Sequence, residues 1–113
     1  MEVTKAKTGK VLVVALKGRL DASTTAVVEQ EIIGAIDGGE KWLLLDLAGM
    51  NYVSSIGLRV FVLAAKRLKT AGGSARFCGV QEPVQRIFDM AGLSTRMEFF
   101  PTQESALLGF PPA

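Results

Sequence analysis

The chain has 113 residues, of which 49% are hydrophobic and 21% are charged, values that are typical of one globular domain and that exclude disorder. It contains no histidine and one cysteine, which excludes a Ser-His-Asp triad, a His-ligated metal site and an internal disulfide. The 13 basic and 11 acidic side chains give a formal charge of +2, which is too small to indicate binding to nucleic acid.

Neither export nor a membrane span is indicated by the sequence. The N-terminus lacks a signal-peptide pattern, and no apolar stretch approaches the roughly 20 residues of a transmembrane helix. The single cysteine, Cys78, lies within a predicted strand and is interpreted as a small core residue. We therefore expect a soluble cytoplasmic protein.

Hydrophobic periodicity and turn residues divide the chain into alternating strands and helices. The predicted elements, in chain order, are an edge strand over 2–7, a tight turn at 8–10, a strand over 11–16, a helix over 22–37, a strand over 41–46, a helix over 55–71, a strand over 74–80, a short helix over 82–91, a strand over 97–100 and a helix over 103–108. Residues 109–113 are expected to form a frayed, flexible tail.

The boundaries in the first half of the chain rest on glycines and on capping residues. The GRLD segment at 18–21 is predicted to end the second strand, and Asp21 or Ser23 to cap the helix that follows. The next strand is apolar on both faces, which predicts a central place in the sheet. The AGMN segment at 48–51 is predicted to be the loop after it.

These elements predict an α/β fold with a single domain. The short turn at 8–10 makes the first strand pair antiparallel, and connections through helices make the later pairs parallel. We therefore expect a small mixed, mostly parallel sheet of four to five strands flanked by about four helices.

The helix over 55–71 carries more apolar residues than one buried face requires. Its predicted core stripe is Leu58, Phe61, Val62, Ala65 and Leu68, and three further apolar residues, Val60, Leu63 and Ala64, lie off that stripe. The extra surface either packs against a neighbouring helix or faces a partner protein, and the sequence leaves both possibilities open.

Two adjacent serines, Ser54 and Ser55, lie where a buried strand is predicted to give way to this helix. A serine hydrolase would need an activating base, and Lys66 lies ~16 Å along the helix axis from Ser55, too far to reach its hydroxyl. A nucleotide-binding loop needs several glycines, and only Gly57 is present. A single phosphate at the helix start remains compatible with the sequence.

Two interpretations of the serines follow from the residues alone. They cap the helix, or one of them is exposed and is modified by another protein. A phosphoryl group there would add about 1.5 to 2 negative charges, which the helix dipole tolerates. A partner surface packed over the same place would have to desolvate that charge, so modification would act as a binding switch without refolding.

Several segments, in this order and spacing, resemble the STAS domain of anti-sigma factor antagonists over nearly the whole chain. They are GRLD at 18–21, LLDL at 44–47 leading through Val53 to SSIGLR at 54–59, AGG at 71–73 and PVQRIFDMAGL at 83–93. In that family the unphosphorylated protein binds an anti-sigma factor that is also a serine kinase, and so releases a sigma factor. The kinase then phosphorylates a serine at the start of the second helix, binding is lost, and a metal-dependent phosphatase of the PP2C type restores it.

The resemblance implies a bacterial phosphoprotein that regulates transcription by partner switching, with no enzymatic activity and no cofactor, and that is a monomer when free. It places the phosphorylated serine on Ser55, with Ser54 as the alternative. The partner-binding residues that it implies are Asp21, Ser54, Ser55, Ile56, Gly57 and Arg59. The chain departs from the best-known members at Ser54, where they often carry Asp, so a second hydroxyl stands beside the acceptor.

The apolar helix over 55–71 also favours an alternative function within the same family. The chain could serve as a STAS-domain subunit of another assembly, such as a stress-sensing scaffold or a lipid-transport complex, and act there by protein binding.

Overall fold

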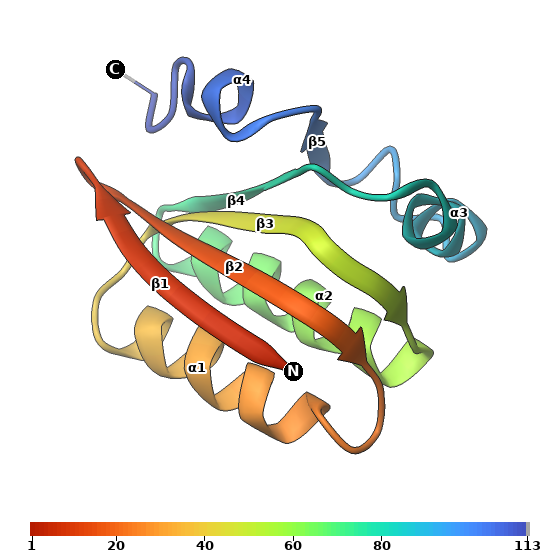
Figure 1. Cartoon of the computed structure of the whole chain (residues 1–113). Coiled ribbons are helices and arrows are strands. Elements are labelled where there is room, and N and C mark those ends of the chain that lie inside the picture. The colour runs from red at the N-terminus through yellow and green to blue at the C-terminus, as the bar shows by residue number, and fades with distance from the viewer. Residues whose placement is uncertain (113) are drawn as a thin grey trace.

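The computed structural model describes residues 1–112, which form five strands and four helices around one sheet (Figure 1). The elements are β1 (Glu2–Thr8), β2 (Val11–Leu20), α1 (Thr25–Asp37), β3 (Trp42–Val53), α2 (Ser55–Thr70), β4 (Ser74–Cys78), α3 (Glu82–Met90), β5 (Glu98–Phe100) and α4 (Gln103–Leu107). Within residues 1–112, no helix has the length and apolar character needed to cross a membrane.

The sheet has the order β1-β2-β3-β4-β5, with β1 antiparallel to β2 and the other pairs parallel. Gly9, in the turn between β1 and β2, has a φ of +60° and so allows the tight reversal that an antiparallel pair requires. The helices supply the crossovers between the parallel strands. The predicted α/β fold, with its mixed sheet and four flanking helices, is confirmed.

Strands β2 and β3 are both longer than the sequence predicts. The segments 18–21 and 48–51 were expected to end β2 and to form a loop after β3. Residues 18–20 and 48–51 instead continue the two strands, which pair from Lys17↔Gly49 to Leu20↔Val53, and only Asp21 of these segments falls outside a strand. A shift in register between Gly18 and Arg19 accommodates the irregular segment. These predictions were wrong because burial of side chains such as Leu20 and Met50 outweighs the local turn propensity of glycine and asparagine.

Helix α1 begins three residues later than predicted. Its N-cap position is Thr24, whose side chain does not cap the helix, so neither Asp21 nor Ser23 is its N-cap. Residues 21–24 form a turn instead, in which the Asp21 carbonyl accepts hydrogen bonds from the N–H groups of Thr24 and Thr25. The polar residues before α1 therefore order a loop at the end of β2.

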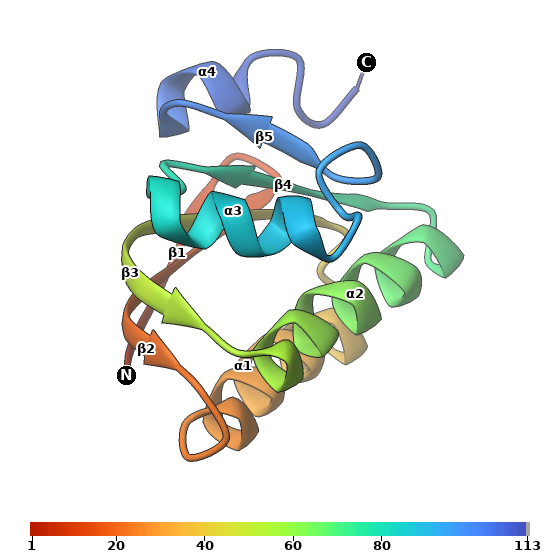
Figure 2. The ribbon, with the colours of Figure 1, turned by 90° about the vertical axis from the view of Figure 1, so that its right-hand side faces the viewer.

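The two faces of the sheet are covered unequally. Helices α1, α2 and α3 bury the larger core, and α4 covers the other face with a smaller cluster (Figure 2). That smaller cluster includes Phe110, which is 7% exposed and packs edge-on against Trp42 with 5.8 Å between ring centroids. The expected tail over 109–113 is thus anchored at Phe110, and Ala113 lies outside the described residues.

Helix α2 buries Leu58, Phe61 and Leu68 of the predicted core stripe, but its buried face is shifted slightly around the helix from the predicted one. Val60 and Ala64 are buried, whereas Val62 and Ala65, predicted to be core residues, are half-buried. Part of the extra apolar surface is explained by α1, which packs beside α2 and is joined to it by an Arg67–Asp37 ion pair of 2.8 Å. Val62 and Leu63 stay partly accessible on the outer side of α2.

Candidate functional site

Ser54 joins the last residue of β3 to the first residue of α2. Its N–H donates to the carbonyl of Leu20 at 2.9 Å, which ties the junction to the end of β2. Its Oγ accepts from the N–H of Gly57 at 3.1 Å, and its carbonyl accepts from the N–H of Leu58 at 2.9 Å. Ser54 is therefore the N-cap of α2, and its hydroxyl oxygen is used by the helix.

Ser55 is the first residue of α2 and differs from Ser54 in both exposure and bonding. It is exposed, and its hydroxyl makes no hydrogen bond to any residue within 1–112. The neighbouring Ile56 is 46% exposed, and Arg59, one turn further along α2, is also exposed. The first N–H groups of a helix and its positive dipole end lie beside this hydroxyl, so the position favours negative charge.

Gly57 holds the first turn of α2 close to the sheet. A Cβ atom at this position would lie 2.7 Å from Leu20 Cγ and 3.0 Å from Val53 Cγ2. Gly57 is among the residues predicted to bind a partner, but it is buried. It therefore lies beneath the binding surface and supports it. This close approach fixes the direction in which the exposed side chains of Ser55, Ile56 and Arg59 leave the helix.

Asp21 lies at the same end of the sheet as the two serines, since it directly follows Leu20, to whose carbonyl Ser54 is bonded (Figure 2). Its Oδ1 accepts hydrogen bonds from Ser23 Oγ at 2.7 Å and from the Ser23 N–H at 3.0 Å. These bonds, with a smaller contribution from the charge of Arg19, lower the pKa of Asp21 from its ordinary value. Asp21 is therefore a fixed anionic group beside the start of α2.

Two further residues belong to this surface and were not predicted as site residues. The guanidinium of Arg19 lies 4.4 Å from the ring centroid of Tyr52 and its Nε lies 3.6 Å from Asp21 Oδ2. Arg19 and Tyr52 are register partners in β2 and β3. The pairing of β2 with β3 would have identified both residues, but it was missed because residues 48–51 were predicted to form a loop.

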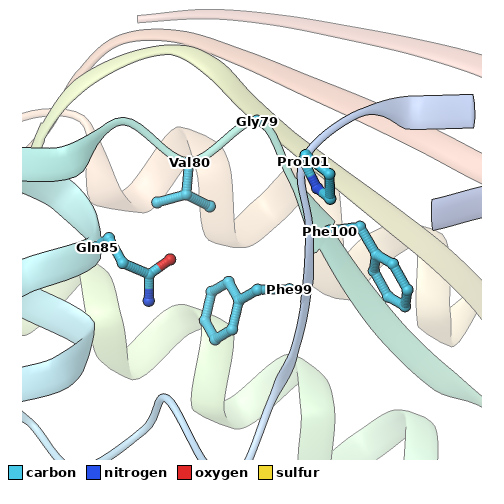
Figure 3. Close-up of a pocket in the computed structure, with 6 residues that line it drawn as sticks. All are labelled: Gly79, Val80, Gln85, Phe99, Phe100 and Pro101. Carbon is cyan, nitrogen blue, oxygen red and sulfur yellow. The ribbon is translucent and has the colours of Figure 1, made fainter. Parts of the chain in front are cut away.

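A cavity outside this surface, and the single cysteine, do not indicate catalysis. A cavity of about 460 Å³ lies at the carboxyl ends of β4 and β5 (Figure 3), and its lining contains no titratable side chain; the lining residues are Gly79, Val80, Gln85, Phe99, Phe100 and Pro101. Cys78 is buried, and burial, with a smaller contribution from Asp46, raises the pKa of its thiol to about 11, so the thiol stays protonated at neutral pH. Within residues 1–112, no cluster of acidic or cysteine side chains could hold a metal ion.

Comparison with known proteins matches this chain to one family. The model of the STAS domain matches residues 2–106. The protein BtrV of Bordetella bronchiseptica, provisionally named an anti-sigma factor antagonist, is 30% identical over 113 residues, which are 100% of this chain and 97% of that protein. The anti-sigma F factor antagonist of Paenibacillus polymyxa is 33% identical over 98 residues, which cover 86% of this chain and 84% of that protein.

The fold agrees with a solved antagonist as well. The structure of the anti-sigma factor antagonist SpoIIAA in its unphosphorylated form has a TM-score of 0.81 and 19% identity, and it covers 94% of this chain and 93% of that chain. SpoIIAA of Bacillus in its phosphorylated form, also 19% identical, has a TM-score of 0.74 with 94% and 96% covered. The chain therefore belongs to the STAS domain family and has the fold of the anti-sigma factor antagonists.

Proposed function

We infer that this protein is an anti-sigma factor antagonist that is switched by phosphorylation of Ser55. In its unphosphorylated form it binds an anti-sigma factor that is a serine kinase, and this binding releases a sigma factor. The kinase transfers the γ-phosphoryl group of ATP to Ser55 Oγ, whose proton is lost as ADP leaves, and the modified protein no longer binds. A phosphatase of the PP2C type restores the hydroxyl by hydrolysis.

The observation that carries this proposal is the difference between the two serines. A kinase needs an accessible hydroxyl oxygen as the nucleophile, and Ser55 is exposed with its hydroxyl unbonded within residues 1–112. Ser54 is half-buried, and its oxygen caps α2 through the Gly57 N–H. Phosphorylation of Ser54 would remove that cap, whereas phosphorylation of Ser55 leaves it in place.

The physical effect of the phosphoryl group is expected at the binding surface and not in the fold. A phosphate on the first residue of α2 lies at the positive end of the helix dipole, where negative charge is stabilised. On the surface formed by Asp21, Ile56 and Arg59 it adds bulk and charge. A partner packed against Ile56 would have to desolvate that charge, so the complex dissociates.

The protein acts by binding, as a cytoplasmic monomer when free, and needs no cofactor of its own. Its relatives in Bordetella bronchiseptica and Paenibacillus polymyxa, both named anti-sigma factor antagonists, support this function. SpoIIAA, which has been solved in both unphosphorylated and phosphorylated forms, supports a phosphorylation switch on this fold.

A pull-down from the native cell lysate tests the proposal. Ser55→Ala serves as bait and Ser55→Asp as the matched control, because both are expected to fold while only the first keeps an uncharged surface. We expect Ser55→Ala to retain an ATP-binding kinase and Ser55→Asp to lose it. Equal recovery with both baits would contradict the proposal, and recovery of an assembly without any ATP-binding regulator would favour a STAS subunit of another complex.

A further inference from the structure

A groove runs between α1 and α2, beginning beside the exposed serine. It has a volume of about 480 Å³, and its lining residues are Thr25 and Glu29 of α1 and Ile56, Arg59, Val62, Leu63 and Lys66 of α2. The apolar part is accessible, since Ile56 is 46% exposed and Val62 and Leu63 are only half-buried. Ile56 and Arg59 belong both to this groove and to the surface around Ser55, so the two are continuous.

The charges of the groove are predominantly basic and unneutralised. Arg59 and Lys66 are exposed, and neither forms an ion pair with a residue in the part of the chain that the structure describes. By contrast, Arg67 on the same helix is paired with Asp37. Glu29 is the acidic residue among the lining residues, so the groove keeps an excess of positive charge.

The spacing of these charges defines the shape of a complementary partner. Arg59 and Lys66 are seven positions apart in α2, which is about 10 Å along the helix axis, and Val62 and Leu63 lie between them. An amphipathic helix lying along the groove would match this pattern with two carboxylates seven positions apart and apolar residues three and four positions after the first.

We propose that the α1–α2 groove docks an acidic amphipathic helix of the anti-sigma factor kinase. The apolar side chains of that helix pack on Ile56, Val62 and Leu63, and its carboxylates pair with Arg59 and Lys66. This inference rests on the proposed function and extends its binding surface from the first turn of α2 along about two further turns. Beyond Ile56 and Arg59, which also border Ser55, the groove gives the kinase contacts at Val62, Leu63 and Lys66, further along α2 from the phosphoryl group.

Charge reversal with a matched control tests the groove. The kinase recovered with Ser55→Ala is titrated against the variants Arg59→Glu, Lys66→Glu and Lys69→Glu in the same Ser55→Ala chain. Each variant changes the net charge equally, and Lys69 is an exposed residue of α2 outside the groove lining. We expect Arg59→Glu and Lys66→Glu each to weaken binding about tenfold or more, and Lys69→Glu by less than about twofold.

Two outcomes would contradict docking in the groove and leave the proposed function unaffected. If Lys66→Glu weakens binding no more than Lys69→Glu, the kinase binds only around Ser55 and Arg59 and does not use the rest of the groove. Strong weakening by Glu29→Gln, which should bind at least as tightly as the parent, would show that the partner presents a cation and not carboxylates. Failure of any kinase to bind the Ser55→Ala chain would instead contradict the proposed function itself. Circular dichroism and urea unfolding confirm that each variant is folded.

Discussion

The start of α2 lies at one end of the sheet and the C-terminal segment packs on one face of it, and different groups hold the two in place. The start of α2 is held through the backbone: the Ser54 N–H bonds to the Leu20 carbonyl, and Gly57 packs against Leu20. Its side chains at positions 55, 56 and 59 are consequently free and exposed.

The C-terminal segment is held through its backbone carbonyls and, unlike the start of α2, also through one of its own side chains, Phe110. Arg76 donates to the carbonyls of Ala106 and Leu108 at 3.0 and 2.8 Å, and its guanidinium lies 4.6 Å from the ring centroid of Phe110. Phe110 in turn fills the smaller core cluster. The C-terminal segment buries the Phe110 side chain as part of its anchor, whereas the start of α2 is anchored without using the side chains at positions 55, 56 and 59. The two regions should therefore respond differently to mutation.

The largest expected loss of stability comes from the C-terminal anchor. Phe110→Ala should lower the free energy of unfolding by about 3 kcal/mol, because it removes a buried ring and leaves a cavity against Trp42. Leu108→Ala, at a side chain that is 73% exposed, should change it by less than about 0.5 kcal/mol. Urea unfolding measures both. Equal stabilities of the two variants would show that Phe110 does not anchor the segment, and neither variant should weaken kinase binding.

The next effect concerns the backbone anchor of α2. Gly57→Ala should cost about 2 kcal/mol, because the new methyl group would overlap Leu20 and force the first turn outward. Gly34→Ala is the matched control, since a Cβ there meets no atom within 4 Å. It should stabilise α1 by up to about 1 kcal/mol through helix propensity. Thermal unfolding that moved in the same direction for both variants would contradict the close packing at Gly57.

The two serines provide a smaller and sharper comparison. Ser54→Ala should cost about 1 kcal/mol, because the N–H of Gly57 loses its capping acceptor. Ser55→Ala should change stability by less than about 0.5 kcal/mol, since its hydroxyl is exposed and unbonded within residues 1–112. Denaturant midpoints of the two variants measure the difference. A larger loss for Ser55→Ala would reverse the roles that we assign to the two hydroxyls.

The smallest expected effect is a shift in the titration of Asp21. Hydrogen bonds from Ser23 lower its folded pKa below the ordinary value of 3.8, so its contribution to stability is present above the unfolded pKa and is lost as the pH falls through the folded pKa. Carboxyl NMR should show that Ser23→Ala raises the pKa of Asp21. Thr24→Ala, which removes a longer contact of 3.4 Å, should raise it less. A titration of the parent chain at or above 3.8 would be inconsistent with the turn.

The sequence predicted those features that depend on local pattern. Periodicity and turn residues located the helices, and the predicted ends at 71 and 91 lie one residue beyond the observed ends of α2 and α3. Ser54 was considered as a cap from its residue type alone, and the structure confirms it in that role. These features are local because capping and amphipathic spacing involve residues within a few positions of one another.

Features that depend on distant pairing could not be predicted in this way. Gly49 and Asn51 have the composition of a loop, but Gly49 pairs with Lys17 of β2, and Asn51 is the extra residue of β3 at the register shift between Gly18 and Arg19. The contact of Arg19 with Tyr52 follows from that same pairing. Phe110 looked like part of a frayed end because its partner, Trp42, lies 68 positions earlier in the chain. The sequence also could not predict that Ser55 is exposed and Ser54 half-buried, because this depends on how the first turn of α2 is oriented on the sheet.

The central claim is that phosphorylation of Ser55 releases the kinase without unfolding the protein. The most direct measurement incubates the parent chain with its kinase and ATP, locates the phosphate by peptide mass spectrometry, and measures kinase affinity before and after modification by calorimetry. We predict a single phosphate on Ser55, an unchanged circular dichroism spectrum and a loss of affinity of about 100-fold or more, since a charged group must be desolvated at the interface. Phosphate on Ser54, or equal affinity of the two forms, would contradict the claim.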